Sequence, residues 1–494
     1  GVFLAIPMKR QMINREKLPF PTGMAAATAL RSLYSEGKDA VRKAYALIAS
    51  LAGGIVVGIL KAPEGAIVRL DHVLDKIHMR LPELLPTAGY WQINGRQLIG
   101  FGFEPSVLLI GAGMLIGVRV CLSMLAGALL LYLVIGPWVI SMDAANAMIE
   151  GYHFSIPVVG GGTVYHLFRW AIWGGTAVMV FSSLATLALQ WKTVARSIKI
   201  LRGGQAVQPS EVDRRMKSIE VPLSWLVAGL IPASIGLLAV QYFAFQISLW
   251  LGLIAVGMSF FLSLVACRAT GETDTTPVSA MGKVMQLLFA ALSPGNITHN
   301  LASAGVTANS AAASADFLTE LKSGYMLGAN PRKQFLAQFI GVFFGTLAIV
   351  PAWYLMVPNK AVLEAYNPPS TNVWRAVAEV LAGGGLDMLP MSARLAIVIG
   401  ALVGVAIPLL ENFLPRCRPY LPSAMGLGLS WIFSYSNSQA FAIGSVGVWL
   451  WTRMNKRSAD DYAVPVASGL IAGESLAAAL VAIIATLIGI LHLQ

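Results

Sequence analysis

Charged residues are scarce in this chain, and their scarcity excludes a soluble protein. Only 12% of the 494 residues are charged while 56% are hydrophobic, whereas soluble domains carry about 25% charged residues. Such a composition suits helices that lie in lipid. The sequence therefore predicts an integral membrane protein whose first partner is the lipid bilayer, in a cell membrane (plasma or inner membrane).

Motifs for nucleotide, metal and redox chemistry are also missing. The sequence contains no GxxxxGK[ST] phosphate loop, no HExxH and no CxxC pair, so it gives no recognisable site for ATP hydrolysis, zinc catalysis or disulfide exchange. The three cysteines, Cys121, Cys267 and Cys417, are far apart and offer neither metal-ligand spacing nor a disulfide framework. We therefore expect no cofactor, no metal site and no enzyme.

The basic residues outnumber the acidic ones, yet nucleic acid is not the expected partner. The formal charge is +11, but the basic residues lie in short loops between apolar runs. Residues 9–43 carry eight of them and residues 192–220 carry seven, whereas residues 141–168 carry none. Cytoplasmic loops of membrane proteins collect Lys and Arg. The first two segments are therefore predicted to be cytoplasmic and the third external.

The apolar runs predict an all-α fold. About a dozen or more transmembrane helices fit the hydropathy, because only helices and closed barrels satisfy the backbone in lipid. We expect one membrane domain over residues 1–494 with approximate halves 1–268 and 269–494, since SAGVTANSAAA at 303–313 weakly echoes ASGLIAGESLA at 467–477. The first residues resemble the last turns of a membrane helix, so we expect further helices upstream.

The stretch from Leu292 to Arg332 combines membrane-like hydropathy with a broken backbone. No Lys, Arg, Asp or Glu occurs from Val284 to Ala315, yet Ser293-Pro294-Gly295-Asn296 interrupts any helix there. Transporters build binding sites from such discontinuous helices, because polar backbone at membrane depth must line a cavity or be buried in protein. A tightly packed helix pair is the alternative, since Ala, Gly and Ser fill 11 of the 15 positions from 301 to 315.

A second polar interruption, at residues 434–439, lies in another apolar run. We predict that the two interruptions line one cavity near the middle of the membrane; the alternative for the second is an interfacial loop. The candidate substrate-binding residues are Asn296, His299, Asn300, Asn309, Ser310, Tyr435, Ser436 and Asn437.

Glu474 is the first candidate for proton coupling. It is the only Asp, Glu, Lys or Arg between Tyr462 and Leu491, and a charge at the middle of a membrane helix costs about 2.5–3.5 kcal/mol or more. A carboxyl that exchanges a proton as its surroundings change would couple transport to protons; a neutral carboxyl in a structural hydrogen bond is the alternative. Asp316 and Glu272 are further candidates. The alternative for Asp316 is a structural ion pair with Lys322, and the alternative for Glu272 is a solvated helix start.

Several blocks of the sequence resemble the oligopeptide transporter family, including its yellow-stripe-like branch. They are IPMKRQMINREKLPFPTG at 6–23, ETDTTPVSAMGK at 272–283, NSAAASADFLTELKSGYMLGANPRKQ at 309–334, MGLGLSWIFSYSNSQAFAIGSVGVW at 425–449 and SGLIAGESL at 468–476. The resemblance implies two homologous helical halves and proton-coupled transport of small peptides or metal–chelator complexes of the siderophore or nicotianamine kind. By this resemblance, we expect the family's first membrane helices to precede residue 1.

Three rival interpretations stay open at this point. The chain would transport another organic solute, or act as a membrane-embedded enzyme with Glu474 and Asp316 as acid and base, or serve as a scaffold in a larger complex. The sequence also leaves a homodimer open. Uptake driven by a pH gradient separates transport from the other two.

Overall fold

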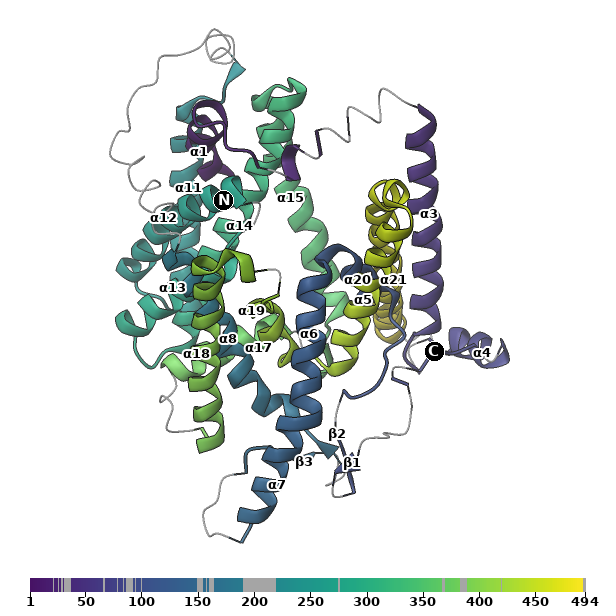
Figure 1. Cartoon of the computed structure of the whole chain (residues 1–494). Coiled ribbons are helices and arrows are strands. Elements are labelled where there is room, and N and C mark those ends of the chain that lie inside the picture. Colours follow the sequence, from purple (N-terminus) through teal and green to yellow (C-terminus); the bar gives the residue numbers. More distant parts are fainter. Residues whose placement is uncertain are drawn as a thin grey trace. The chain divides into compact units, whose positions relative to one another are not determined.

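The computed structural model describes residues 1–20, 22–24, 26–27, 30, 37–64, 67–77, 79–82, 84–85, 92–93, 95–98, 100–148, 154–156, 158–159, 164–189, 219–273, 276–366, 369–382, 389–418 and 420–491. These residues are mostly helical (Figure 1). They form two compact units, which interleave along the chain. The first unit contains residues 1–36, 183–347 and 374–388, and the second contains residues 37–182, 348–373 and 389–494.

The first unit is built from long apolar helices around a broken one. Its main helices are α1 (Ala5–Lys9), α11 (Leu223–Phe245), α12 (Leu249–Thr273), α13 (Val278–Leu292), α14 (Ile297–Leu327) and most of α15 (Pro331–Met356). The expected break at residues 293–296 is confirmed between α13 and α14. Gly295 has a φ of +79°, which glycine adopts without strain, and the Asn296 side chain accepts a hydrogen bond from the His299 backbone N–H at 3.0 Å to start α14.

Small residues let α14 pack closely against α12 and α13. Ala304 and Ala311 are fully buried in two apolar clusters that also contain Met285, Phe289 and Met281. Close approach through alanine is the packing that a tight helix pair requires. The small residues of α14 therefore contribute to helix packing. A cavity lined by its polar residues stays a prediction.

The N-terminal residues correct one prediction. Residues from Lys9 onward were expected to form a cytoplasmic loop, but Val2–Arg15 is helical and packs against α14. Lys9 is 2% exposed, and its ammonium donates to the Glu220 carboxylate at 2.6 Å. A buried charge is tolerated when it is paired in this way. A prediction from the number of basic residues in a segment cannot include a partner that is distant in the sequence.

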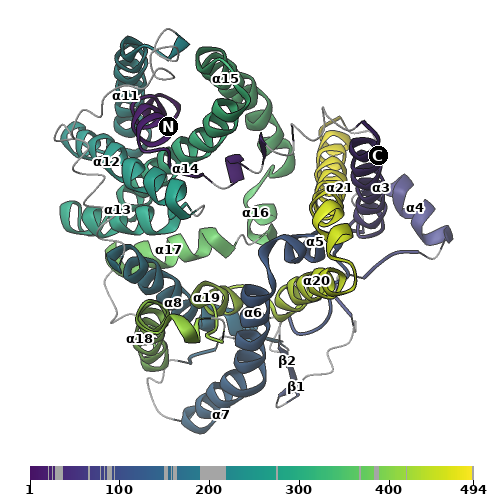
Figure 2. The same cartoon turned by 45° about the horizontal axis from the view of Figure 1, so that its top comes forward.

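The second unit contains most of the remaining helices. They are α3 (Gly37–Leu60), α4 (Val68–Ile77), α5 (Val107–Ile116), α6 (Val118–Leu130), a π-helical turn (Leu131–Ile135), α7 (Gly136–Asn146), most of α8 (Leu167–Leu189), α16 (Lys360–Tyr366), the start of α17 (Pro369–Ala382), α18 (Met391–Phe413), α19 (Ala424–Ser430), α20 (Tyr435–Met454) and α21 (Lys456–Leu491). Helices α3 and α21 lie side by side (Figure 1, Figure 2). Helices α6 and α7 form one long apolar rod through the π-helical turn.

A small sheet joins the segment before α5 to the segment between α7 and α8. Its strands are β1 (Gln92–Ile93), β2 (Arg96–Leu98), β3 (Val158–Val159) and β4 (Val164–Tyr165), in the order β1-β2-β4-β3. Strands β2 and β4 are parallel, with Gln97 opposite Val164, and the other two pairs are antiparallel. The sheet is a minor addition to an otherwise helical fold.

The polytopic all-α membrane fold is confirmed. Among the described residues, seven helices are long and apolar enough to cross a membrane: Val41–Leu60, Val118–Asn146, Ser224–Phe245, Leu249–Gly271, Pro331–Met356, Met391–Phe413 and Lys456–Ile490. Helices α5 and α13 are shorter apolar helices. The division into halves at residue 268 stays a prediction.

The orientation in the membrane gives a first test. Most of the basic segment 192–220 lies outside the described residues. In the segment 141–168, which is predicted to be external, Ser155 is buried, but Met148 is 98% exposed. In a background without the exposed Cys417, we expect a membrane-impermeant maleimide added outside the cell to label Met148→Cys at once, and Ser210→Cys only after permeabilisation. The opposite labelling pattern would invert the topology.

Candidate functional site

The structure brings three of the predicted residues of the first break together. The Ser293 hydroxyl and His299 Nδ1 are 2.8 Å apart, and Asn296 caps the helix that carries His299. Asn300 is fully buried and donates from Nδ2 to the Gln286 backbone oxygen at 2.8 Å. This polar group therefore fastens the start of α14 to α13.

Two other predicted residues lie farther along α14. Asn309 is exposed and donates to the Gly305 backbone oxygen at 2.9 Å, while Ser310 is half-buried. At 1.5 Å per residue, Asn309 is about 14 Å along the helix axis from Asn300. A single small ligand group does not reach both places.

The second break lies slightly before its predicted position. Helix α19 ends at Ser430 and α20 starts at Tyr435, so the polar residues Tyr435, Ser436 and Asn437 form the first turn of a helix. Tyr435 stacks on Phe101 with ring centroids 4.6 Å apart, and the Ser436 backbone N–H donates to the Gly100 oxygen at 3.2 Å. The first break belongs to one unit and this one to the other, so the expected shared cavity stays a prediction.

The Glu474 side chain, on α21, lies against the amino terminus of the short apolar helix α5. Its side chain is buried, with 6% of the residue exposed. The carboxylate accepts hydrogen bonds from the Ser106 hydroxyl at 2.9 Å and from the Leu108 backbone N–H at 2.7 Å. Ser106 is also the N-cap of α5. The unpaired N–H groups and the dipole at a helix start favour an anion, so a carboxylate stabilises the start of α5.

A lysine completes the surroundings of Glu474. The Lys61 ammonium is 3.3 Å from Glu474 Oε1 and 2.9 Å from Glu104 Oε1, so one cation bridges two carboxylates. Sequence reasoning missed Lys61, Glu104 and Ser106 because all three are remote from Glu474 along the chain. The available signal was their position: Lys61 directly follows an apolar run, and Glu104 shortly precedes another.

Paired glycines hold Glu474 against α3. Gly54 and Gly58 of α3 meet Gly473 and Glu474 of α21, and Gly469 meets Leu47 and Ser50. Both helices thus carry a GxxxG pattern, which lets two backbones approach closely. The pairs run in the same chain direction, so α3 and α21 are parallel. Glu474 is therefore level with the last turn of α3, next to Lys61.

The other two candidate carboxylates are less informative. The Glu272 side chain, in the last turn of α12, lies outside the described residues. Asp316 is exposed on α14. The expected ion pair with Lys322 is wrong: the Lys322 ammonium donates to the Leu18 backbone oxygen at 2.7 Å, and no ion pair joins it to Asp316 among the described residues. The chain folds residues 1–20 over this face of α14, which a helical spacing rule does not reveal.

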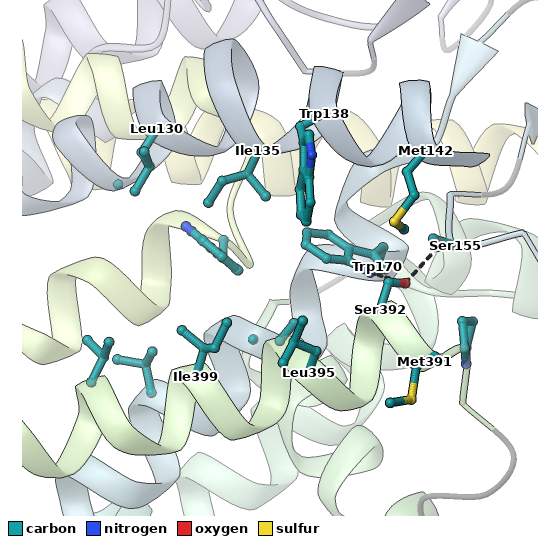
Figure 3. A pocket seen from close by; sticks show the side chains of 18 of the residues that line it. Leu130, Ile135, Trp138, Met142, Ser155, Trp170, Met391, Ser392, Leu395 and Ile399 are labelled. Carbon is teal, nitrogen blue, oxygen red and sulfur yellow. Dashed lines mark hydrogen bonds between the residues drawn. The ribbon is translucent and has the colours of Figure 1, made fainter. Parts of the chain in front are cut away.

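The second unit also contains an apolar groove. The groove has a volume of about 560 Å³. Figure 3 shows it between the rod of α6 and α7 and helix α18. Trp138, Leu395 and Ile399 line it, and at one end the Ser392 hydroxyl donates to the Ser155 hydroxyl at 2.6 Å. No charged side chain belongs to its described lining. A groove of this kind suits an apolar group and gives no anchor for a charged solute.

Comparisons with known proteins agree with this membrane architecture. The family model of the OPT oligopeptide transporter protein matches residues 1–485. A putative oligopeptide transporter of Saccharomyces cerevisiae is 24% identical, over 96% of this chain and 78% of its own length. Two probable metal-nicotianamine transporters of Oryza sativa subsp. japonica are also each 24% identical over 96% of this chain, covering 71% and 67% of their own lengths. The chain therefore belongs to the OPT oligopeptide transporter family, whose members are membrane transporters and not enzymes.

Proposed function

We propose that this protein is a proton-coupled secondary transporter that imports small oligopeptides or metal–chelator complexes across the plasma or inner membrane. The family and the names of its relatives support the two substrate classes. The observation that carries the coupling is the buried Glu474 carboxylate, which shares the Lys61 ammonium with Glu104. The site has the two properties that a proton carrier needs: a carboxyl shielded from bulk water and a partner for its charged form.

A proton on Glu474 changes the balance of charges around Lys61. With Glu474 ionised, the ammonium is drawn to two carboxylates, at 2.9 and 3.3 Å. Once Glu474 is protonated, Glu104 is the remaining anion of the pair, so Lys61 moves toward it. The start of α5 loses its anion in the same step. Protonation thereby loosens the contacts that join α3, α5 and α21 around this carboxyl.

One short segment connects this carboxyl to predicted substrate-binding residues. Gly100 and Phe101 contact the first turn of α20, through the Ser436 N–H and the Tyr435 ring. Five residues after Phe101, Ser106 donates to Glu474. We infer that residues 100–108 carry the coupling, because a shift of α5 at Glu474 displaces the loop that packs on Tyr435. The same segment thus responds to the proton and to an occupant beside α20.

The polar candidates suit an organic solute better than a bare metal ion. They are neutral Asn, Ser and Tyr side chains and one His, which recognise amide and carboxylate groups by hydrogen bonds. No group of three or more His, Cys, Asp or Glu side chains that could hold a metal ion occurs among the described residues. A metal that is already chelated needs no such ligands. Another organic solute with the same groups is the alternative cargo.

Uptake into proteoliposomes tests the proposal. We expect labelled tetraalanine or Fe(II)–nicotianamine to accumulate above its external concentration when an inward proton gradient is imposed. Each pH unit supplies about 1.4 kcal/mol per proton, enough for about tenfold accumulation with one coupled proton. A protonophore should abolish the accumulation, and protein-free liposomes are the control. Uptake that does not depend on the proton gradient would contradict proton coupling. If neither probe accumulates, another organic solute is favoured as the cargo.

A further inference from the structure

A buried lysine in α13 has no role in the site described so far. Lys283 is 1% exposed. Its ammonium has no hydrogen-bond partner among the described residues, and lies 4.2 Å from the centre of the Trp374 ring. Gly282 makes this contact possible, because a Cβ at that position would come within 1.8 Å of the indole. Trp374 therefore covers the lysine and holds it against the helix.

Two buried amide side chains, one on α13 and one packed against it, also carry unpaired oxygens. Gln286 follows Lys283 by three residues, on the same face of α13, and donates from Nε2 to the Trp374 backbone oxygen at 3.1 Å. Asn300 donates from Nδ2 to the Gln286 backbone oxygen at 2.8 Å. Both side chains are fully buried, and neither Gln286 Oε1 nor Asn300 Oδ1 has a partner among the described residues. These donor bonds fix the orientation of both amides.

The ammonium and the two amide oxygens lack hydrogen-bond partners of complementary kinds. A buried ammonium without an anion and buried carbonyl oxygens without donors are each costly to a folded protein, and proteins rarely retain them without a reason. The ammonium lacks a negative acceptor, and the two oxygens lack N–H donors. An amino-carboxylate group supplies both at once: a carboxylate for the lysine and an amine for the amide oxygens.

We propose that Lys283, Gln286 and Asn300 form a subsite for an amino-carboxylate group of the transported solute. The proposal rests on the proposed transport function and narrows its cargo. The termini of a peptide and the arms of an amino-acid-derived metal chelator share this chemistry. Asn300 is one turn from Asn296, so the subsite adjoins the break between α13 and α14. The three side chains are buried, so ligand binding requires a rearrangement of α13 and α14 that exposes them.

Ligand binding to the purified protein gives the first test. We expect tetraalanine to raise the unfolding temperature of the wild type more than tetraalanine amide does, since the amide lacks the carboxylate. Lys283→Met should remove this preference and weaken tetraalanine binding at least tenfold. Gln286→Met should likewise remove the preference for a free over an N-acetylated amino terminus. Binding of Fe(II)–nicotianamine is measured in the same way. Comparing it with tetraalanine shows whether a chelate or a peptide supplies the amino-carboxylate group.

Stability without ligand gives the second test, with Lys322→Met as matched control. Lys322 is also buried, but its ammonium donates to the Leu18 backbone oxygen. We expect Lys283→Met to raise the unfolding temperature, because it removes a desolvated and unpaired charge, and Lys322→Met to lower it. A Lys283→Met protein that loses stability as Lys322→Met does would show a structural lysine and overturn the subsite.

Two further results separate the subsite from the transport function. If the wild type binds tetraalanine and its amide equally, or binds none of the probes, the amino-carboxylate subsite is wrong. Gradient-driven uptake of a different solute would still uphold the proposed function in that case. Loss of all gradient-driven uptake, with the carboxylate preference intact, would instead contradict the function and leave the subsite in place.

Discussion

Glu474→Gln should abolish proton-driven accumulation while the protein still folds and still exchanges solute downhill in part. Glutamine keeps the size of a protonated glutamate. Its carbonyl oxygen can accept from the Leu108 N–H while its amide group donates to the Ser106 hydroxyl, but it cannot gain or lose a proton. Lys61 keeps Glu104 as its partner, at 2.9 Å. Because hydrogen bonds between membrane helices average only about 0.6 kcal/mol, we expect little change in stability. Concentrative uptake and counterflow in proteoliposomes measure the two activities.

A second ion pair between the same helices provides the matched control. Lys43 and Asp461 are 2.9 Å apart and join α3 to α21, but both are partly exposed. Asp461→Asn should therefore accumulate solute as the wild type does. Equal accumulation by Glu474→Gln and the wild type would remove Glu474 from the mechanism. Asp316 and Glu272 would then be the carboxylates to test.

Gly54→Ala should destabilise the protein and reduce transport, whereas Gly53→Ala should do neither. A Cβ on Gly54 would lie 2.6 Å from the Leu470 backbone oxygen and 2.9 Å from the Glu474 nitrogen, and backbone atoms cannot move aside singly. We expect a loss of about 1–3 kcal/mol from overpacking. The added methyl group also pushes apart the helices that bring Glu474 to Lys61, so coupling should fail along with stability.

The adjacent Gly53 provides the control for Gly54→Ala. Nothing lies within 4 Å of a Cβ built on Gly53, and replacing glycine by alanine in a helix gains about 0.5–1 kcal/mol. Thermal unfolding in detergent, followed by size-exclusion chromatography, should place the two variants on opposite sides of the wild type. If both variants lose stability equally, the GxxxG patterns do not stabilise the protein through close contact between α3 and α21.

Local chemistry in the sequence determined the membrane fold and the position of the first break. The apolar runs indicate helices because lipid satisfies no backbone group, and Pro294 with Gly295 ends a helix whatever lies around it. The isolation of Glu474 in an apolar run likewise marked it as a candidate. Each of these inferences depends on residues within one helix length of each other, which is why hydropathy and turn chemistry suffice for them.

Only the tertiary structure decided which groups meet. Lys61 and Ser106 are 413 and 368 residues away from Glu474 along the chain, and no spacing rule joins them. Lys9 was assigned to a loop because its partner Glu220 is 211 residues away, and Lys322 binds the backbone of Leu18 instead of the nearby Asp316. The physical reason is common to all three. A charge in a membrane protein takes its partner from whichever helix packs beside it, and that choice depends on the shapes of whole helices, such as the glycine faces of α3 and α21.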